Sequence, residues 1–137
     1  HISPDALAPL FWKVIVEDDT SYHIGGLSLL DLDKPIEYKE FKRAEPDLFK
    51  RFGKYDSIFN TYFWFAGYPI MKTKTSDKGA IITFGDLRFS STVEFVRNLL
   101  KNKQAPFSLT AILDQNHKIT GYYYYHHGKT RIIQQLE

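Results

Sequence analysis

The sequence predicts an α+β domain, mainly an antiparallel sheet with two or three short helices packed on one face. Three pairs of strand-like segments are joined by short turns, which is typical of antiparallel hairpins. Two helical patterns stand between the first and second pairs, and this order favours α+β over parallel βαβ winding. The chain has 137 residues and 43% hydrophobic content, which is enough for one two-layer core.

The first hairpin is predicted from two apolar segments around a polar turn. Residues 11–17 are mostly apolar, residues 18–21 have turn chemistry, and residues 22–30 resume a strand pattern. Two adjacent glycines inside the second segment indicate a bulge or a bend. A short segment at 36–41 can add an edge strand.

Two short amphipathic helices are predicted next. Residues 44–54 contain Pro46 near a helix start and Gly53 as a stop. Asp56 or Ser57 can cap a second helix. The apolar residues of that helix are spaced for one helical face: Ile58, Phe59, Tyr62, Phe63 and Phe65. Both helices are expected to pack their aromatic faces on the sheet.

The remaining elements are two further hairpins. Segments 68–75 and 80–89 flank a turn at 76–79, and segments 107–113 and 119–125 flank a turn at 114–117. Between these hairpins, residues 91–100 are compatible with either a short helix or a loop. No internal repeat or second-domain boundary is evident.

Composition restricts the function classes and the domain plan. Residues 1–10 contain two prolines and are interpreted as a linker-like lead-in to a single soluble domain at 11–137. Eighteen Lys and Arg face sixteen Asp and Glu without a long basic run, so nucleic acid is not an expected partner. The chain contains no cysteine, which excludes disulfides and thiolate metal sites. No apolar run is long enough for a transmembrane helix.

Asp86 and Arg88 form a charged pair within the strand-like stretch GAIITFGDLRFSS. Alternation places both on the same face as Ile82 and Phe84, so the pair continues a hydrophobic row. One interpretation is a hydrogen-bonded polar cluster that fixes sheet register. The other is a binding site in which Arg88 contacts an anionic ligand or a lipid head group.

A run of four tyrosines provides further candidate ligand contacts. Tyr122 and Tyr124 should lie on one sheet face, opposite Tyr123 and Tyr125. Rings on the helix-covered face would be core, whereas rings on the other face would form an aromatic binding surface. Tyr122 and Tyr124 are the candidates from this run. Trp64 is expected to pack against the core and is retained as a further candidate contact.

Histidines are the remaining candidates for metal chemistry. His117 lies in a predicted turn, and His126 with His127 ends the last predicted strand. Adjacent strand residues point to opposite faces, so these two do not easily share one metal, and no metal site is predicted from them. No nucleophile elbow, phosphate loop or zinc-protease motif occurs, so no catalytic residue is predicted.

Three stretches together resemble one protein family: SPDALAPLFWKVIVED, YHIGGLSLLD and ITFGDLRFS. They look like the soluble C-terminal region of bacterial inner-membrane-bound hydrolases that are proposed to depend on a metal. The resemblance implies a parent protein at the cell membrane, whose membrane-embedded N-terminal part carries the histidines and aspartates for a divalent metal. None of those residues is in this chain, so the resemblance implies a non-catalytic accessory domain, without its own cofactor, that binds substrate or regulates access.

Two other hypotheses remain open. The chain can be a free-standing peptide- or carbohydrate-binding module that uses the aromatic sheet face. Alternatively, it can be a small metal-dependent enzyme built from His117, His126 or His127 with nearby carboxylates.

Overall fold

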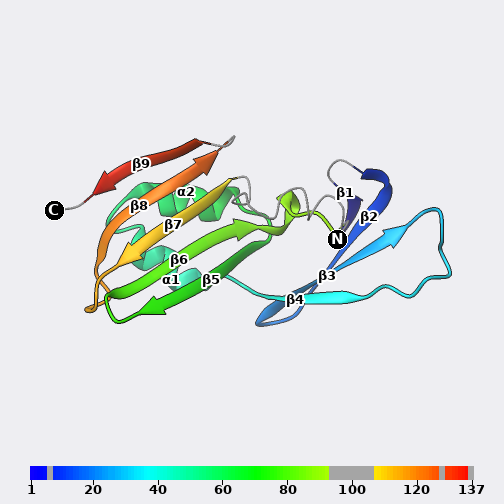
Figure 1. The fold of residues 1–137 in the computed structure, drawn as a ribbon, viewed down its shortest axis with the longest axis horizontal. Coiled ribbons are helices and arrows are strands. Elements are labelled where there is room, and N and C mark those ends of the chain that lie inside the picture. Colours follow the sequence, from blue (N-terminus) through cyan, green and yellow to red (C-terminus); the bar gives the residue numbers. More distant parts are fainter. Residues whose placement is uncertain (6–7, 93–106, 127–128, 136–137) are drawn as a thin grey trace.

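The computed structural model describes residues 1–5, 8–92, 107–126 and 129–135. Two antiparallel sheets lie side by side, and two helices accompany the second, so the molecule is elongated (Figure 1). The predicted α+β class is confirmed. The strands form two sheets, one in each half of the chain. Among the described residues, one isolated β-bridge, between Arg43 and Ile70, pairs the two halves.

The first sheet has four strands in the order β1-β2-β3-β4. They are β1 (Ile2–Asp5), β2 (Ala8–Glu17), β3 (Ser21–Ser28) and β4 (Tyr38–Lys42). The carboxylate of Asp18 closes the predicted turn between β2 and β3, where it accepts the N–H groups of Thr20 at 2.9 Å and Ser21 at 2.8 Å. Such a local side-chain bond makes this hairpin recognisable from sequence.

Residues 1–10 are not the linker that the sequence suggested. They contain β1 and the beginning of β2, and Ile2 pairs with Val14 in the sheet. The N-terminal amino group donates to the carbonyl oxygen of Ile15 at 2.9 Å. Pro4 is compatible with this strand because β1 lies at a sheet edge, where a residue without an N–H is tolerated.

The second sheet has five strands that follow one another in chain order. They are β5 (Pro69–Ser76), β6 (Gly79–Asp86), β7 (Ser108–Leu113), β8 (Ile119–His126) and β9 (Lys129–Gln135). Gly79 has a φ of 137°, and a Cβ there would lie 2.0 Å from the carbonyl oxygen of Leu113, so the turn into β6 requires glycine. β9 is not among the predicted strands; its polar sequence KTRIIQQ becomes a strand by pairing with β8.

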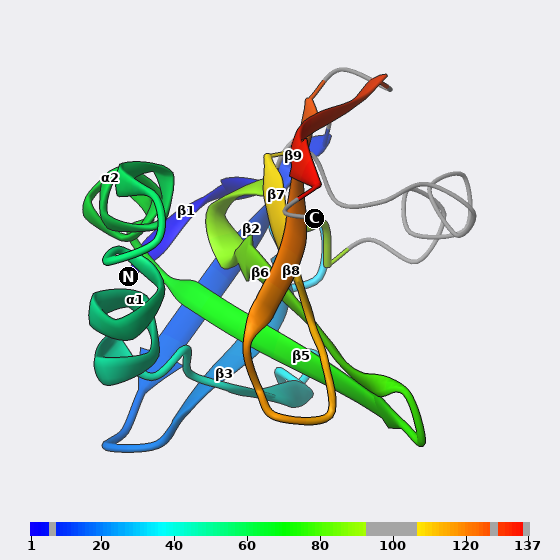
Figure 2. The ribbon, with the colours of Figure 1, turned by 90° about the vertical axis from the view of Figure 1, so that its left-hand side faces the viewer.

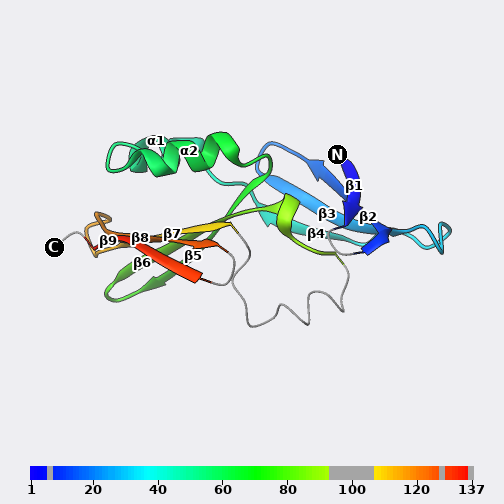
Figure 3. The same cartoon turned by 90° about the horizontal axis from the view of Figure 1, so that it is seen from above.

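Helices α1 (Pro46–Phe52) and α2 (Ser57–Phe65) lie on one face of the second sheet (Figures 2 and 3). Pro46 occupies the first turn of α1, where an N–H has no partner within the helix. Asp56 caps α2 by accepting the N–H of Ile58 at 2.9 Å. Both predicted helix starts are confirmed.

Aromatic rings fill the space between these helices and the sheet. The ring of Phe49 on α1 lies 4.4 Å from that of Phe84 on β6, and the rings of Phe52 and Phe59 are 5.3 Å apart. The buried residues of this core are Ala44, Phe49, Phe52, Phe59, Tyr62, Ile82, Phe84, Leu109, Ala111, Leu113, Ile119 and Tyr122. The second sheet therefore holds the main hydrophobic core.

The strand predicted at 80–89 ends earlier, at Asp86, and a 3-10 turn, η1 (Leu87–Phe89), follows it. The Asp86 carboxylate accepts the N–H of Arg88 at 2.9 Å, and this local bond competes with continuation of the strand. Most of the segment predicted as helix or loop, residues 93–100, lies outside the described residues.

A buried lysine connects the first sheet to η1. Lys13 on β2 is fully enclosed, and its Nζ donates to the carbonyl oxygens of Leu87 at 2.9 Å and Arg88 at 3.2 Å and to a third carbonyl just after η1. Burial lowers the pKa of Lys13, while the negative charges of Asp5 and Asp86 oppose this effect. The ammonium group thus satisfies the carbonyl oxygens of Leu87, Arg88 and Ser90 at the end of this turn.

Asp5 makes a second polar contact across the same junction. Its buried carboxylate accepts the hydroxyl of Ser91 at 2.8 Å and the N–H of Thr92 at 2.7 Å. Gly26 lets this segment approach, since a Cβ there would lie 3.1 Å from Oγ1 of Thr92. A small apolar cluster lies at the same junction and consists of Ile15, Tyr22, Ile24 and Leu87.

We expect Lys13→Met to lower the free energy of unfolding by about 3 kcal/mol, because buried carbonyl oxygens and Asp5 lose their cation. Lys50→Met, at an exposed position on α1, is the matched control and should change it by less than about 0.5 kcal/mol. Urea unfolding followed by circular dichroism measures both. Equal stability of Lys13→Met and the unmodified protein would show that the buried ammonium group contributes no net stability.

Candidate functional site

Asp86 holds three chain segments together at the end of β6. Its side chain is buried and accepts the N–H groups of Gly67 at 3.0 Å, Tyr68 at 3.3 Å and Arg88 at 2.9 Å. These bonds attach the connection between α2 and β5 to the start of η1. The structural interpretation of Asp86 fits this geometry, because all of these partners belong to the protein's own backbone.

Arg88 combines an ion pair with aromatic contacts. Its Nε donates to the Asp86 carboxylate at 2.8 Å, and its Nη2 donates to the carbonyl oxygen of Phe65 at 2.6 Å. The guanidinium carbon lies 5.0 Å from the ring centre of Phe65 and 5.4 Å from that of Phe89. No hydrogen bond of Nη1 is seen among the described residues, so this nitrogen keeps donors for a ligand.

An aromatic surface surrounds this arginine. The rings of Phe65 and Phe89 stack at 6.1 Å with an interplanar angle of 8°, and Phe107 lies 4.7 Å from Phe89. Next to Phe65, Trp64 is 84% exposed, and Phe65 itself is 43% exposed. We call Trp64, Phe65, Arg88, Phe89 and Phe107 the Arg88 patch.

The exposure of Trp64 corrects the expectation that it packs against the core. Phe59 and Tyr62 are the buried residues of α2 and face the sheet. Trp64 follows Tyr62 by two residues, which is about 200° around a helix, so it points to the opposite side. Three of the five predicted ligand residues, Asp86, Arg88 and Trp64, therefore gather at one end of α2.

The other two predicted ligand residues lie on the helix-covered face of the second sheet. Tyr122 is buried in the core, 5.4 Å from the ring of Phe59, and its hydroxyl donates to the Asp56 carboxylate. Tyr124 is partly buried and packs against the same core. Tyr123, on the opposite face, is also partly buried. These positions make Tyr122 a core residue, which removes a central contact from the aromatic binding-module hypothesis.

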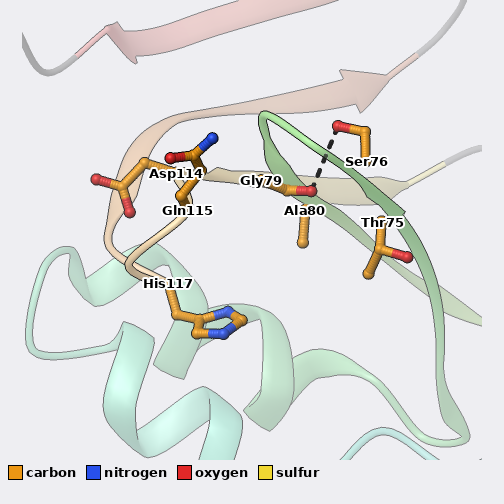
Figure 4. A pocket seen from close by; sticks show the side chains of 7 residues that line it. All are labelled: Thr75, Ser76, Gly79, Ala80, Asp114, Gln115 and His117. Atoms are coloured by element: carbon orange, nitrogen blue, oxygen red, sulfur yellow. Dashed lines mark hydrogen bonds between the residues drawn. The ribbon is translucent and has the colours of Figure 1, made fainter.

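His117 lies in the turn between β7 and β8, where its φ of 58° is left-handed. It borders a shallow hollow of about 270 Å³ between two hairpin turns (Figure 4). Asp114, in the same hollow, accepts the N–H groups of Asn116 and Lys118, each at 2.9 Å. This carboxylate therefore shapes the turn.

The candidate histidines do not converge. His126 ends β8, whereas His117 precedes that strand, so roughly 20 Å of extended chain separates them. His127 lies outside the described residues. The part of the chain that the structure describes contains no group of three or more histidines and carboxylates placed to hold a metal ion.

Sequence reasoning missed the residues that support the Arg88 patch. Lys13 was not selected, although a lysine between apolar residues in FWKVIV shares a face with Ile15 and so was a detectable sign of a buried charge. Phe65, Phe89 and Phe107 come from distant parts of the chain. Their association had no local signal.

We expect Asp86→Asn to lower the free energy of unfolding by about 3 kcal/mol, because it removes a buried charge and leaves Arg88 without its anion. Asp47→Asn is the matched control at an almost fully exposed carboxylate and should have little effect. Thermal and urea unfolding of both variants test the difference. If Asp86→Asn proves as stable as Asp47→Asn, the carboxylate does not hold this junction together.

Tyr122 should make stability fall at alkaline pH. Burial, with a smaller contribution from the bond to Asp56, raises the pKa of Tyr122 to about 12, whereas an unfolded tyrosine titrates near pH 10. The neutral hydroxyl therefore contributes full stability below about pH 10, and this contribution is lost as pH rises towards about 12. Urea unfolding across this interval should show a smaller decrease for Tyr122→Phe than for the unmodified protein. Identical decreases would contradict the assignment.

Comparison of the chain with family models, curated proteins and solved structures found no match. None of the described helices is both long and apolar enough to cross a bilayer.

Proposed function

We propose that this chain is a non-catalytic accessory domain that contacts a membrane surface through the Arg88 patch. The observation that carries this proposal is the exposure of Trp64, which directly precedes Phe65, the residue whose carbonyl oxygen accepts Nη2 of Arg88. As the sequence resemblance implies, the parent protein is a membrane-bound, metal-dependent hydrolase in which the domain binds substrate or regulates access. The membrane-embedded N-terminal part of that polypeptide is its immediate partner.

The chemistry of the patch suits the boundary between lipid and water. Tryptophan rings prefer the head-group region, because the ring is apolar and the indole N–H still finds polar partners there. Phe65 adds apolar surface beside Trp64. Nη1 of Arg88, for which the described residues supply no acceptor, can donate to a phosphate oxygen of a head group. Aromatic insertion and a phosphate contact would then occur at one place.

The charges of the patch predict how this contact responds to salt. Arg88 is paired with the buried carboxylate of Asp86 at 2.7 Å, so the two together carry no net charge. Attraction to anionic lipid should therefore be modest, and most of the binding free energy should come from the aromatic rings. Added salt should weaken binding only slightly.

The placement of candidate residues supports this proposal over a small metal-dependent enzyme. His117 and His126 lie before and at the end of β8, and Asp114 serves its own turn. Asp86 and Arg88 are occupied mainly by structural bonds. The groups that remain available to a ligand are one edge of the Arg88 guanidinium and the exposed aromatic rings, which together form a binding surface.

We expect Trp64→Ala to reduce partitioning onto phosphatidylcholine/phosphatidylglycerol vesicles at least about tenfold, because one large buried side chain contributes about 1.5–3 kcal/mol. The chain has two tryptophans, so a Trp12→Phe background leaves Trp64 as the reporter of a blue-shifted emission on binding. Vesicle sedimentation gives the partition coefficients.

Leu30→Ala is the matched control, because it removes an exposed apolar side chain in the connection after β3. It should retain the partition coefficient of the unmodified protein. Failure of the unmodified protein to sediment with vesicles, or equal losses in the two variants, would refute the proposed contact.

A further inference from the structure

The first sheet has a second apolar face that its own core does not use. On β2, Lys13 and Ile15 point inward to the junction, so Trp12, Val14 and Val16 point outward. The pairing register continues this surface over the neighbouring strands: Val14 lies opposite Ile2 on β1. Exposed or partly exposed apolar side chains thus follow one another across the sheet.

A glycine allows the surface to extend over β3 and β4. A Cβ at Gly25 would lie 2.3 Å from Cγ2 of Ile36 and 3.0 Å from the ring of Tyr38. The side chains of Ile36 and Tyr38 therefore pack directly over the backbone of Gly25. We call the complete set the outer face. Its apolar members are Ile2, Leu10, Trp12, Val14, Val16, Leu27, Ile36 and Tyr38.

The outer face is open to solvent. Ile2 is 61% exposed, Leu10 50%, Val16 48% and Tyr38 47%. Together with the partly exposed members, these side chains present roughly 500 Å² of apolar surface, at the upper end of what monomeric proteins leave uncovered. Such a continuous area is typical of an interaction site.

We propose that a second copy of this chain packs its outer face against this one. Two flat sheet faces can pack with their strands aligned, as in a β-sandwich. Two copies would remove roughly 1,000 Å² of surface from water, which is the lower limit of a specific interface. The expected product is a weak, reversible dimer with a two-fold axis.

The outer face carries few charges, which lets the apolar surface of a second copy approach it. His23 contacts Asp18 at 2.8 Å. Glu40 accepts the hydroxyl of Ser21 at 2.6 Å and keeps its negative charge at one end of the face. An anionic bilayer fits less well, because Lys13 points inward.

Lys42, at the end of β4, does not change this conclusion. Its Nζ lies 2.8 Å from the carboxylate of Glu45. The cation nearest the end of the outer face is therefore already paired, and an anionic partner would gain little from it.

Sedimentation-equilibrium measurements of the chain up to about 1 mM test the proposal. We expect a monomer–dimer equilibrium with a dissociation constant in the range of about 10–100 μM. Val16→Lys and Leu10→Lys place a charge on the outer face and should raise this constant at least tenfold. Val16→Ile conserves shape and hydrophobicity and should preserve it.

Leu30→Lys is the matched control, because it places the same charge at an exposed leucine outside the outer face. It should leave the dissociation constant unchanged, and circular dichroism verifies that each variant is folded. A monomer at every concentration would overturn the proposal, as would equal effects of Val16→Lys and Leu30→Lys. If the monomer binds vesicles and Val16→Lys abolishes that binding, the outer face is assigned to lipid instead. The Trp64→Ala variant should still dimerise. Failure of the proposed membrane contact and failure of the proposed dimer are therefore distinguishable.

Discussion

Buried charges around the short turn after β6 attach this turn to both halves of the molecule. On one side, Lys13 of the first sheet donates to backbone carbonyl oxygens of η1. On the other, Asp86 accepts backbone N–H groups from the connection that follows α2 and from η1 itself. Because each charge is removed from water, losing its partners would cost more than losing an exposed ion pair. The relative position of the sheets depends on this junction.

The same junction explains why Asp86 and Arg88 were ambiguous in the sequence. Asp86 is a structural residue, since its acceptor positions are filled by the protein's own N–H groups and by Arg88. Arg88 is held by that carboxylate and by the carbonyl oxygen of Phe65, which fixes its guanidinium between aromatic rings. A cation positioned in this way loses little conformational entropy on meeting an anion. The structural role of Asp86 and the binding role proposed for Arg88 thus depend on each other.

Two surfaces remain available after the core is formed, and they have different chemistry. The Arg88 patch joins a tryptophan to a guanidinium edge at the end of α2, a combination suited to a head-group region. The outer face of the first sheet is mainly apolar, which suits another sheet. The two surfaces belong to different sheets. A domain with both could contact a bilayer and a second copy of itself at once.

Local patterns in the sequence determined the α+β class, the three hairpins and the starts of both helices. Those features depend on residues close in the chain, such as Asp18 closing its turn and Asp56 capping α2. Tertiary pairing decided what local patterns could not show: β1 and β9 become strands by joining neighbours, and the strands separate into two sheets. It also buried Tyr122 and exposed Trp64, because which side of a strand or helix meets the core depends on distant residues. The sequence thus identified Asp86, Arg88 and Trp64 as candidates, and only the fold brought them together.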